Sequence, residues 1–250
     1  MSPDPDPLAP PSAAAHLAPI IDRLRLAVAR RTRQLSLAAG LTGRLGVGDS
    51  AAQLFMMMRN SFPNRGLTSE QLGTPFLYQL PGTAAALEAE LRAGGLVEER
   101  ADALLYLTEQ GKELMRLLLA TGTEAVSELW GTNTCRAAVL LPLVDRSLAA
   151  AAPTGGAGFT LMTPVHDTPD ASAEAKLSER LAGLRFHRFD AHVAAWTAAG
   201  HTAQSIRALP AGSERQAIED DTNRRAGTAY ATLAPAERIV LLGGLGALSG

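Results

Sequence analysis

The spacing of hydrophobic and polar positions along the chain predicts mostly helices. From about residue 13 to residue 39, leucine, isoleucine and valine recur at intervals of three, four and seven, and arginines fill much of the remaining surface. Comparable patterns predict helices over residues 49–60, 83–95, 108–120, 173–199, 213–226 and 235–248. Residues 96–99 and 104–108 are typical of two short strands around a tight turn. We therefore expect a mainly α protein with one β-hairpin.

The distribution of proline, glycine and charge predicts four segments. Residues 1–12 repeat proline and aspartate with little to bury, and we expect a disordered tail. Residues 13–150 form a domain that contains the hairpin and its flanking helices. Residues 151–172 concentrate glycine, proline, threonine and aspartate, which is typical of a linker, and residues 173–250 form a second, helical domain. The absence of βαβ alternation argues against a doubly wound nucleotide-binding sheet.

Composition excludes several classes of protein. The 23 basic and 25 acidic residues give a net charge of −2, so no global positive field draws the chain to nucleic acid or acidic lipid. We find no apolar run of the roughly 18–20 residues that span a membrane and no signal-peptide pattern, and we expect a cytoplasmic protein. Cys135 is the only cysteine, which excludes an internal disulfide. We expect neither a metal site nor a cofactor.

Residues 49–120 are expected to follow the order helix, short helix, helix, hairpin, helix. Within them, Leu91-Arg-Ala-Gly-Gly-Leu-Val is followed by Leu107-Thr-Glu-Gln-Gly-Lys-Glu-Leu. Gly94 is expected to end one helix in a left-handed conformation, and Thr108 to cap the next. The segment resembles the winged helix-turn-helix domain of MarR-type regulators. The resemblance implies a homodimer that binds double-stranded DNA.

The residue types that contact DNA are sparse in this segment. Arginine and threonine side chains that could reach phosphates or bases stand at five positions: Arg59, Arg65, Thr83, Arg92 and Arg100. The candidate recognition helix, residues 83–92, also carries Glu88 and Glu90, and three more acidic residues surround Arg100 in the hairpin. Carboxylates repel a phosphate backbone. The sequence therefore leaves DNA binding open.

A second group of polar residues lies in the helix predicted over residues 173–199. Arg185, Arg188 and His192 fall within about 60° of one another around a helix, with Trp196 beside them. An arginine fork matches a carboxylate or phosphate, and a histidine can exchange a proton near neutral pH. We therefore expect this stripe to bind a small anionic molecule. The alternative is a structural network in which these cations pair with acidic residues such as Glu219 and fasten helices together.

The stretch His187-Arg-Phe-Asp-Ala-His-Val-Ala-Ala is similar to one found in actinobacterial SalK-like proteins, which also contain a MarR-like winged helix. The later segment, residues 217–230, resembles their Ile-Glu-x-x-Thr-Asp stretch with a downstream aromatic residue. This likeness adds Glu219 and Tyr230 to the candidate ligand-binding residues. The order of parts differs, because here the winged helix comes first.

Two functions follow as hypotheses. The first is a dimeric, MarR-like regulator that responds to an anionic small molecule. The second is an enzyme of specialised metabolism in which the winged helix is only a scaffold. In the enzyme, His187 or His192 would be the general acid–base, and Asp190 would orient His187 as carboxylates orient catalytic histidines.

Overall fold

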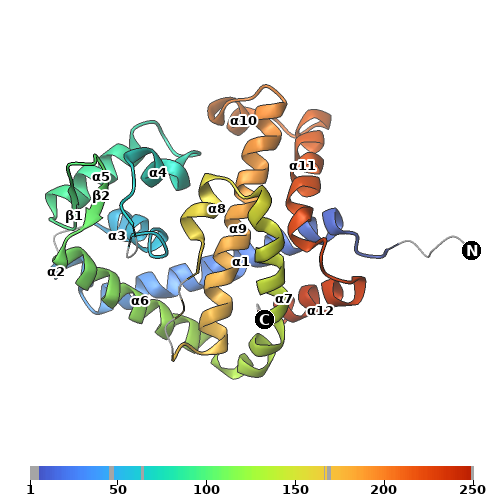
Figure 1. The fold of residues 1–250 in the computed structure, drawn as a ribbon, viewed down its shortest axis with the longest axis horizontal. Helices are drawn as coiled ribbons and strands as arrows, with labels where there is room; N and C mark the ends of the chain where they lie inside the picture. The colour runs from blue at the N-terminus through green and yellow to red at the C-terminus, as the bar shows by residue number, and fades with distance from the viewer. Residues whose placement is uncertain (1–5, 45–47, 63–64, 166, 168–169, 249–250) are drawn as a thin grey trace, which may run out of the picture. The chain divides into compact units, whose positions relative to one another are not determined.

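The computed structural model describes residues 6–44, 48–62, 65–165, 167 and 170–248. Over these residues the protein is mainly helical, and its one sheet is a two-stranded antiparallel hairpin, as the sequence predicted (Figure 1). The described helices include none with the length and apolar character needed to cross a membrane.

The elements follow one another along the chain in a simple order. The α-helices are α1 (Pro10–Ala38), α2 (Leu41–Arg44), α3 (Asp49–Met57), α4 (Ser69–Gly73), α5 (Thr83–Ala93), α6 (Glu109–Trp130), α7 (Thr134–Ala151), α8 (Ala157–Met162), α9 (Ala173–Ala198), α10 (Ala203–Ala208), α11 (Ser213–Ala226) and α12 (Pro235–Gly246). The strands are β1 (Val97–Glu99) and β2 (Leu105–Leu107). Short 3-10 turns, η1 (Thr74–Phe76), η2 (Gly131–Asn133), η3 (Ala152–Thr154) and η4 (Gly227–Tyr230), join some of the helices.

The chain divides into two compact units that are not continuous in sequence. Unit 1 comprises Met1–Leu26, Trp130–Phe159 and Asp167–Gly250, and unit 2 comprises Ala27–Leu129 and Thr160–His166. The sequence had predicted divisions near residues 12, 150 and 172. The difference arises because α1 and α8 each begin in unit 1 and end in unit 2.

Unit 1 is built around α9, which packs against α7 and α11, while α12 packs against α7. Four consecutive residues of α9, 181–184, are buried. Successive residues point 100° apart around a helix, so α9 is enclosed on all sides at this level. Polar side chains that α9 carries near these positions therefore have to find partners within the protein.

Residues 6–12, expected as part of a disordered tail, are instead held against α12. Leu8 is buried, and α1 already begins at Pro10. Arg238 of α12 is 3% exposed, donates a hydrogen bond of 2.6 Å to the Leu8 carbonyl oxygen and pairs with Asp6. The buried guanidinium needs acceptors, and this first stretch of chain supplies two of them.

Unit 2 contains the hairpin, and its turns are fixed by local hydrogen bonds. Thr68 begins α4 in a capping box with Gln71. Thr108 accepts a hydrogen bond of 3.0 Å from the Gly111 amide and so caps α6, as predicted. The left-handed residue after α5 is Gly95, with φ +66°. The prediction of Gly94 at this position was wrong by one residue, since Gly94 is still right-handed.

The hairpin has a regular register, and a third segment joins it. Val97 is opposite Leu107 and Glu99 is opposite Leu105. Leu67, just before α4, exchanges two backbone hydrogen bonds of 3.0 and 2.8 Å with Leu105. This bridge ties the start of α4 to the hairpin and was not foreseen, because one residue pair leaves no periodic pattern in the sequence.

The glycine of the Thr-Glu-Gln-Gly motif at the start of α6, Gly111, lies against the backbone of the hairpin. A Cβ atom at this position would overlap the carbonyl oxygen of Leu96, which accepts a hydrogen bond from the Thr108 amide at 3.1 Å. The obstructing atom belongs to the backbone and cannot rotate away. The first turn of α6 can therefore approach the hairpin only where residue 111 has no side chain.

We predict that Gly111→Ala lowers the free energy of unfolding by about 1–3 kcal/mol or more, because the added methyl group has no room. Gly122→Ala in the same helix is the matched control. There the Cβ atom would lie 3.5 Å from the flexible Met56 side chain, in ordinary contact. Alanine in place of a glycine within a helix raises the free energy of unfolding by about 0.5–1 kcal/mol. Denaturant unfolding of both variants checks this, and equal effects would contradict it.

Candidate functional site

Three of the predicted ligand-binding residues meet between α9 and α11. Arg188 donates a hydrogen bond of 2.7 Å to the Asn223 side chain and forms an ion pair with Glu219. His192, one turn further along α9, lies with Nδ1 3.1 Å from the hydroxyl of Thr222. We call these five residues the α9–α11 cluster. The side chains of Arg188 and Glu219 are 22% and 42% exposed, so solutes can reach the edge of the cluster.

The charges in the cluster act on one another. Burial lowers the pKa of His192; the charge of Glu219 acts against this, while Arg188 and Arg215 reinforce it. Burial also raises the pKa of Tyr230, against which Arg188 acts. Arg188 therefore influences both the predicted acid–base group and the predicted aromatic residue. Because its pKa is lowered from 6.5, His192 is mainly neutral at pH 7.

Two other predicted ligand-binding residues are placed elsewhere. Arg185 pairs with Asp22 of α1, with Nε 2.6 Å from the carboxylate oxygen. Trp196 is 6% exposed and belongs to the core of unit 1. The stripe predicted from helical spacing is therefore divided. Arg188 and His192 face α11, and Arg185 faces α1.

His187 lies apart from the α9–α11 cluster and is buried, next to two threonines that are themselves exposed. Its side chain is 2% exposed, and Nε2 is 2.9 Å from the hydroxyl of Thr154, which lies 3.0 Å from that of Thr228. The ring of Phe159 meets the imidazole edge-on, with centroids 5.8 Å apart. Burial lowers the pKa of His187 to about 4. His187 is thus a neutral core residue that a substrate cannot reach without displacing its neighbours.

Asp190 does not pair with His187 or with an arginine among the described contacts, in contrast to the prediction. Its carboxylate accepts hydrogen bonds from the backbone amides of Gly156, Gly158 and Phe159 at 2.9, 3.0 and 2.7 Å. These amides belong to the start of α8, where helical N–H groups lack internal partners. Burial raises the pKa of Asp190, and the three amides act against it. Asp190 caps a helix and does not orient a histidine.

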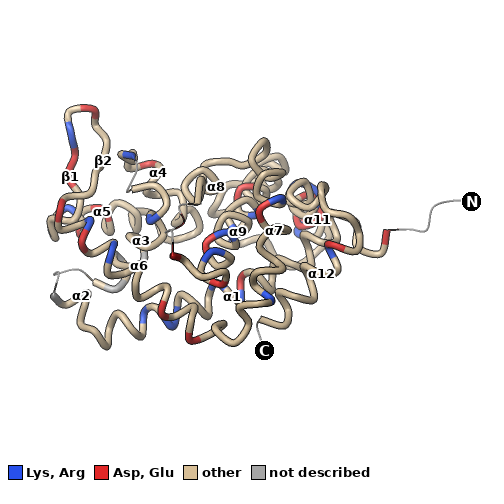
Figure 2. Tube along the Cα trace, turned by 60° about the horizontal axis from the view of Figure 1, so that its bottom comes forward, with Lys and Arg blue, Asp and Glu red and all other residues tan. Residues whose placement is uncertain are grey.

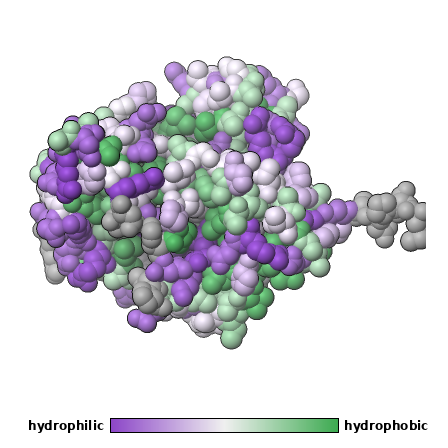
Figure 3. Space-filling model, in the orientation of Figure 1, coloured by the Kyte–Doolittle hydropathy of each residue, from purple (hydrophilic) through white to green (hydrophobic). Residues whose placement is uncertain are grey.

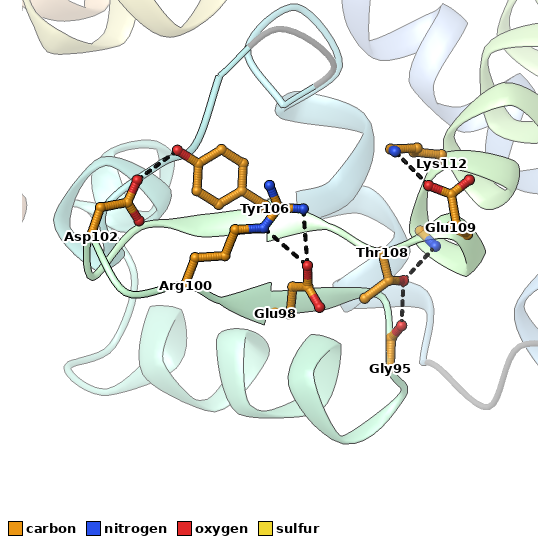
Figure 4. Close-up of polar contacts among 9 residues, drawn as sticks. Gly95, Glu98, Arg100, Asp102, Tyr106, Thr108, Glu109 and Lys112 are labelled. Atoms are coloured by element: carbon orange, nitrogen blue, oxygen red, sulfur yellow. Dashed lines mark hydrogen bonds and ion pairs between the residues drawn. The ribbon is translucent and has the colours of Figure 1, made fainter.

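In unit 2, two of the arginines predicted to contact DNA, Arg92 and Arg100, are paired with carboxylates. Arg92 bridges Glu88 and Glu99 at 2.8 and 2.6 Å. In the hairpin, Arg100 pairs with Glu98 at 3.0 Å (Figure 4). Acidic and basic positions are therefore interspersed along α5 and the hairpin, with the acidic ones in excess (Figure 2). Both arginines remain partly exposed, and such surface pairs are weak enough to open for a phosphate.

The ring of Tyr106 supports Arg100. The guanidinium carbon of Arg100 lies 4.3 Å from the centre of this ring, in a cation–π contact. The Tyr106 hydroxyl donates to Asp102 at 2.8 Å, which lowers the pKa of that carboxyl (Figure 4). The hairpin thus presents its one arginine in a fixed position.

The remaining predicted DNA contacts differ in accessibility. Arg59 is only 6% exposed and donates a hydrogen bond of 2.8 Å to the Met56 carbonyl oxygen, so it is not placed to reach a phosphate. Arg65 is exposed and donates to the Thr160 carbonyl oxygen at 3.0 Å. Thr83 is the first residue of α5 and is half-buried.

Comparisons with known proteins identify no relative of this chain. No protein-family model matches the chain, and no curated protein or solved structure shows significant similarity to it. The described residues also contain no group of three or more histidine, cysteine, aspartate or glutamate side chains placed to hold a metal ion. The site therefore has to be judged on its own geometry.

The sequence did not identify four residues that contact the candidate site residues: Thr154, Thr222, Asn223 and Thr228. Thr222 and Asn223 follow Glu219 by three and four residues, so all three share one face of α11. That spacing could have identified them. Thr154 and Thr228 lie in turns far apart in the sequence, and no local pattern links either of them to His187.

We predict that His187 makes stability depend on pH. Above pH 6.5 the histidine is neutral in both states. As pH falls from about 6.5 towards 4, the unfolded chain binds a proton that the folded protein excludes, and roughly 2–3 kcal/mol of unfolding free energy is lost by pH 4.5. The variant His187→Gln should lose correspondingly less over this range. Denaturant titrations at pH 7 and 4.5 check this, with the exposed His16→Gln as control; parallel losses in all three proteins would exclude it.

Proposed function

We propose that this chain is a MarR-like winged-helix transcriptional regulator that responds to a small anionic molecule. In the proposal, unit 2 binds double-stranded DNA, with α4 and α5 as the helix-turn-helix and the β1–β2 hairpin as the wing. The α9–α11 cluster in unit 1 holds the anion. The observation that carries the proposal is the order α3, α4, α5, β1, β2, α6 within one compact unit.

Three exposed or partly exposed arginines are the proposed phosphate contacts: Arg65, Arg92 and Arg100. They lie before α4, at the end of α5 and in the hairpin, which are the parts of a winged helix that approach a duplex. Phosphate contacts position such a domain but carry no sequence information. Thr83 at the start of α5 is the proposed base contact.

We predict that the protein binds short duplexes from its own gene neighbourhood with a salt dependence of about three released counterions, a log–log slope near −3. Arg92→Gln and Arg100→Gln should each weaken binding to all sequences and reduce the slope by about 1. Fluorescence anisotropy over a range of salt concentrations measures both. Arg224→Gln, an exposed arginine of α11 paired with Asp221, is the matched control. Absence of binding at low salt would refute the DNA-binding function.

A second function is favoured by the charge of α5 and the hairpin. Between residues 83 and 107 there are five acidic residues and two arginines, and both arginines are ion-paired. This favours a small-molecule enzyme in which unit 2 is a scaffold, Arg188 grips the substrate anion and His192 transfers a proton. Anion binding without any DNA binding would support this function over the first.

The anion-binding part of both functions is tested at Arg188. A bound anion must compete with Glu219, so we predict that Glu219→Gln strengthens the rise in melting temperature produced by inorganic phosphate or acetate. Arg188→Met should abolish that rise, while Arg224→Met should leave it unchanged. Thermal melts over a series of anion concentrations check this. If neither the Arg188 variant nor the Glu219 variant alters the anion-dependent rise in melting temperature, the cluster is a structural network.

A further inference from the structure

The buried part of the α9–α11 cluster is the hydroxyl group of Thr222. Helix α11 is otherwise strongly polar, and hydrophilic residues gather over it on the face that Figure 3 presents. Its buried residues are Ile218, Thr222 and Ala226, which follow one another at intervals of about one helical turn. Thr222 is 0% exposed, so bulk water does not compete for its hydroxyl group.

This hydroxyl group has one proton and meets two partners. It donates to the carbonyl oxygen of Ile218 at 2.8 Å, because a carbonyl oxygen can only accept. Its second partner is Nδ1 of His192, at 3.1 Å. Since its single proton is directed at Ile218, the hydroxyl group accepts in this second contact, and Nδ1 carries the hydrogen. A neutral histidine with a hydrogen on Nδ1 has none on Nε2, which is then an acceptor.

Arg188, one turn earlier in α9, has the opposite chemistry. Its guanidinium donates to the side-chain oxygen of Asn223 at 2.7 Å and to the carboxylate of Glu219, and a guanidinium has no lone pair with which to accept. Arg188 and His192 are separated by about 6 Å along the helix axis and are both only half-buried. The cluster therefore places a cationic donor beside a neutral acceptor, Nε2 of His192.

We propose that the α9–α11 cluster binds a small hydroxycarboxylate. The carboxylate of the ligand pairs with Arg188 in place of Glu219, and its hydroxyl group donates to Nε2 of His192. Thr222 is a positioning residue, because it is too deeply buried to touch the ligand and acts by holding one tautomer of the imidazole. The inference rests on the anion binding proposed above and narrows it to one class of ligand.

A hydroxyl group suits Nε2 better than an ammonium, the other common donor of small acids. Burial is the largest cause that lowers the pKa of His192, and Arg188 and Arg215 reinforce it against the charge of Glu219. Burial disfavours positive charge on any group at this position, so a ligand ammonium meets the same penalty as a protonated imidazole. A neutral hydroxyl group does not.

Melting temperatures of the full chain over a series of ligand concentrations test the proposal. Two matched pairs of acids differ by one hydroxyl group: lactate against propionate, and 3-hydroxybutyrate against butyrate. We expect the hydroxylated member of at least one pair to bind roughly fivefold more tightly, which corresponds to one added hydrogen bond. Alanine, with an ammonium in place of the hydroxyl group of lactate, should bind no more tightly than propionate.

Variants of Thr222 test its role in this preference. Thr222→Val removes the acceptor of the Nδ1 hydrogen and should reduce the preference for the hydroxylated acid at least twofold, whereas Thr222→Ser keeps the hydroxyl group and should retain it. Thr121→Val is the matched control, because the buried hydroxyl group of Thr121 also donates within its own helix, to the Leu117 carbonyl oxygen at 2.9 Å. It should leave the preference unchanged.

Nitrogen-15 NMR of the histidine side chains reads the tautomer directly, with His192→Gln to assign the signals. We expect the hydrogen on Nδ1 in the unchanged protein and in Thr222→Ser, and a mixture of tautomers in Thr222→Val. A hydrogen on Nε2 in the unchanged protein, or equal affinity for both members of both pairs, overturns the inference while anion binding stands. If none of the four acids raises the melting temperature, the proposed anion binding is overturned together with it.

Discussion

The enclosure of α9 is the constraint on which unit 1 depends. Because residues 181–184 are buried on all sides, the polar side chains along this helix lose water and each requires a partner. Arg180 reaches two carboxylates, Asp145 and Asp167. Arg188 reaches Glu219, His187 reaches the hydroxyl of Thr154, and Asp190 reaches three amides of the backbone. The partners come from different segments, so satisfying α9 also fixes the positions of α7, α8 and α11.

The elements that could be predicted are those whose information is local. Helix α11 has the predicted bounds, and α9 ends within one residue of its prediction, because glycines mark these ends locally: Gly200 follows α9, and Gly212 and Gly227 flank α11. Helix α8 was missed since its glycine-rich sequence is typical of a linker. Its first amides are held by Asp190, more than thirty residues later in the chain. A helix stabilised by a distant side chain leaves no signal in its own sequence.

The same distinction applies to the candidate site. Helical spacing predicted that Arg188 and His192 share a face, because residues four apart do, and in the structure both face α11. It failed for His187 and Asp190, which are also three apart but have partners on other segments. Spacing establishes that two side chains could meet, whereas burial and the neighbouring backbone decide whether they do. For Arg59 the sequence contained no indication of burial.

The contact between Arg238 and the first residues of the chain has a practical consequence. Asp6 and the Leu8 carbonyl oxygen accept hydrogen bonds from the buried guanidinium of Arg238, which belongs to the C-terminal helix α12. The two ends of the polypeptide are therefore fastened to each other within unit 1. A protease that removes the first eight residues would uncover a charge at the opposite end of the chain. An affinity tag cleaved within this stretch would have the same effect, although the sequence there looks dispensable.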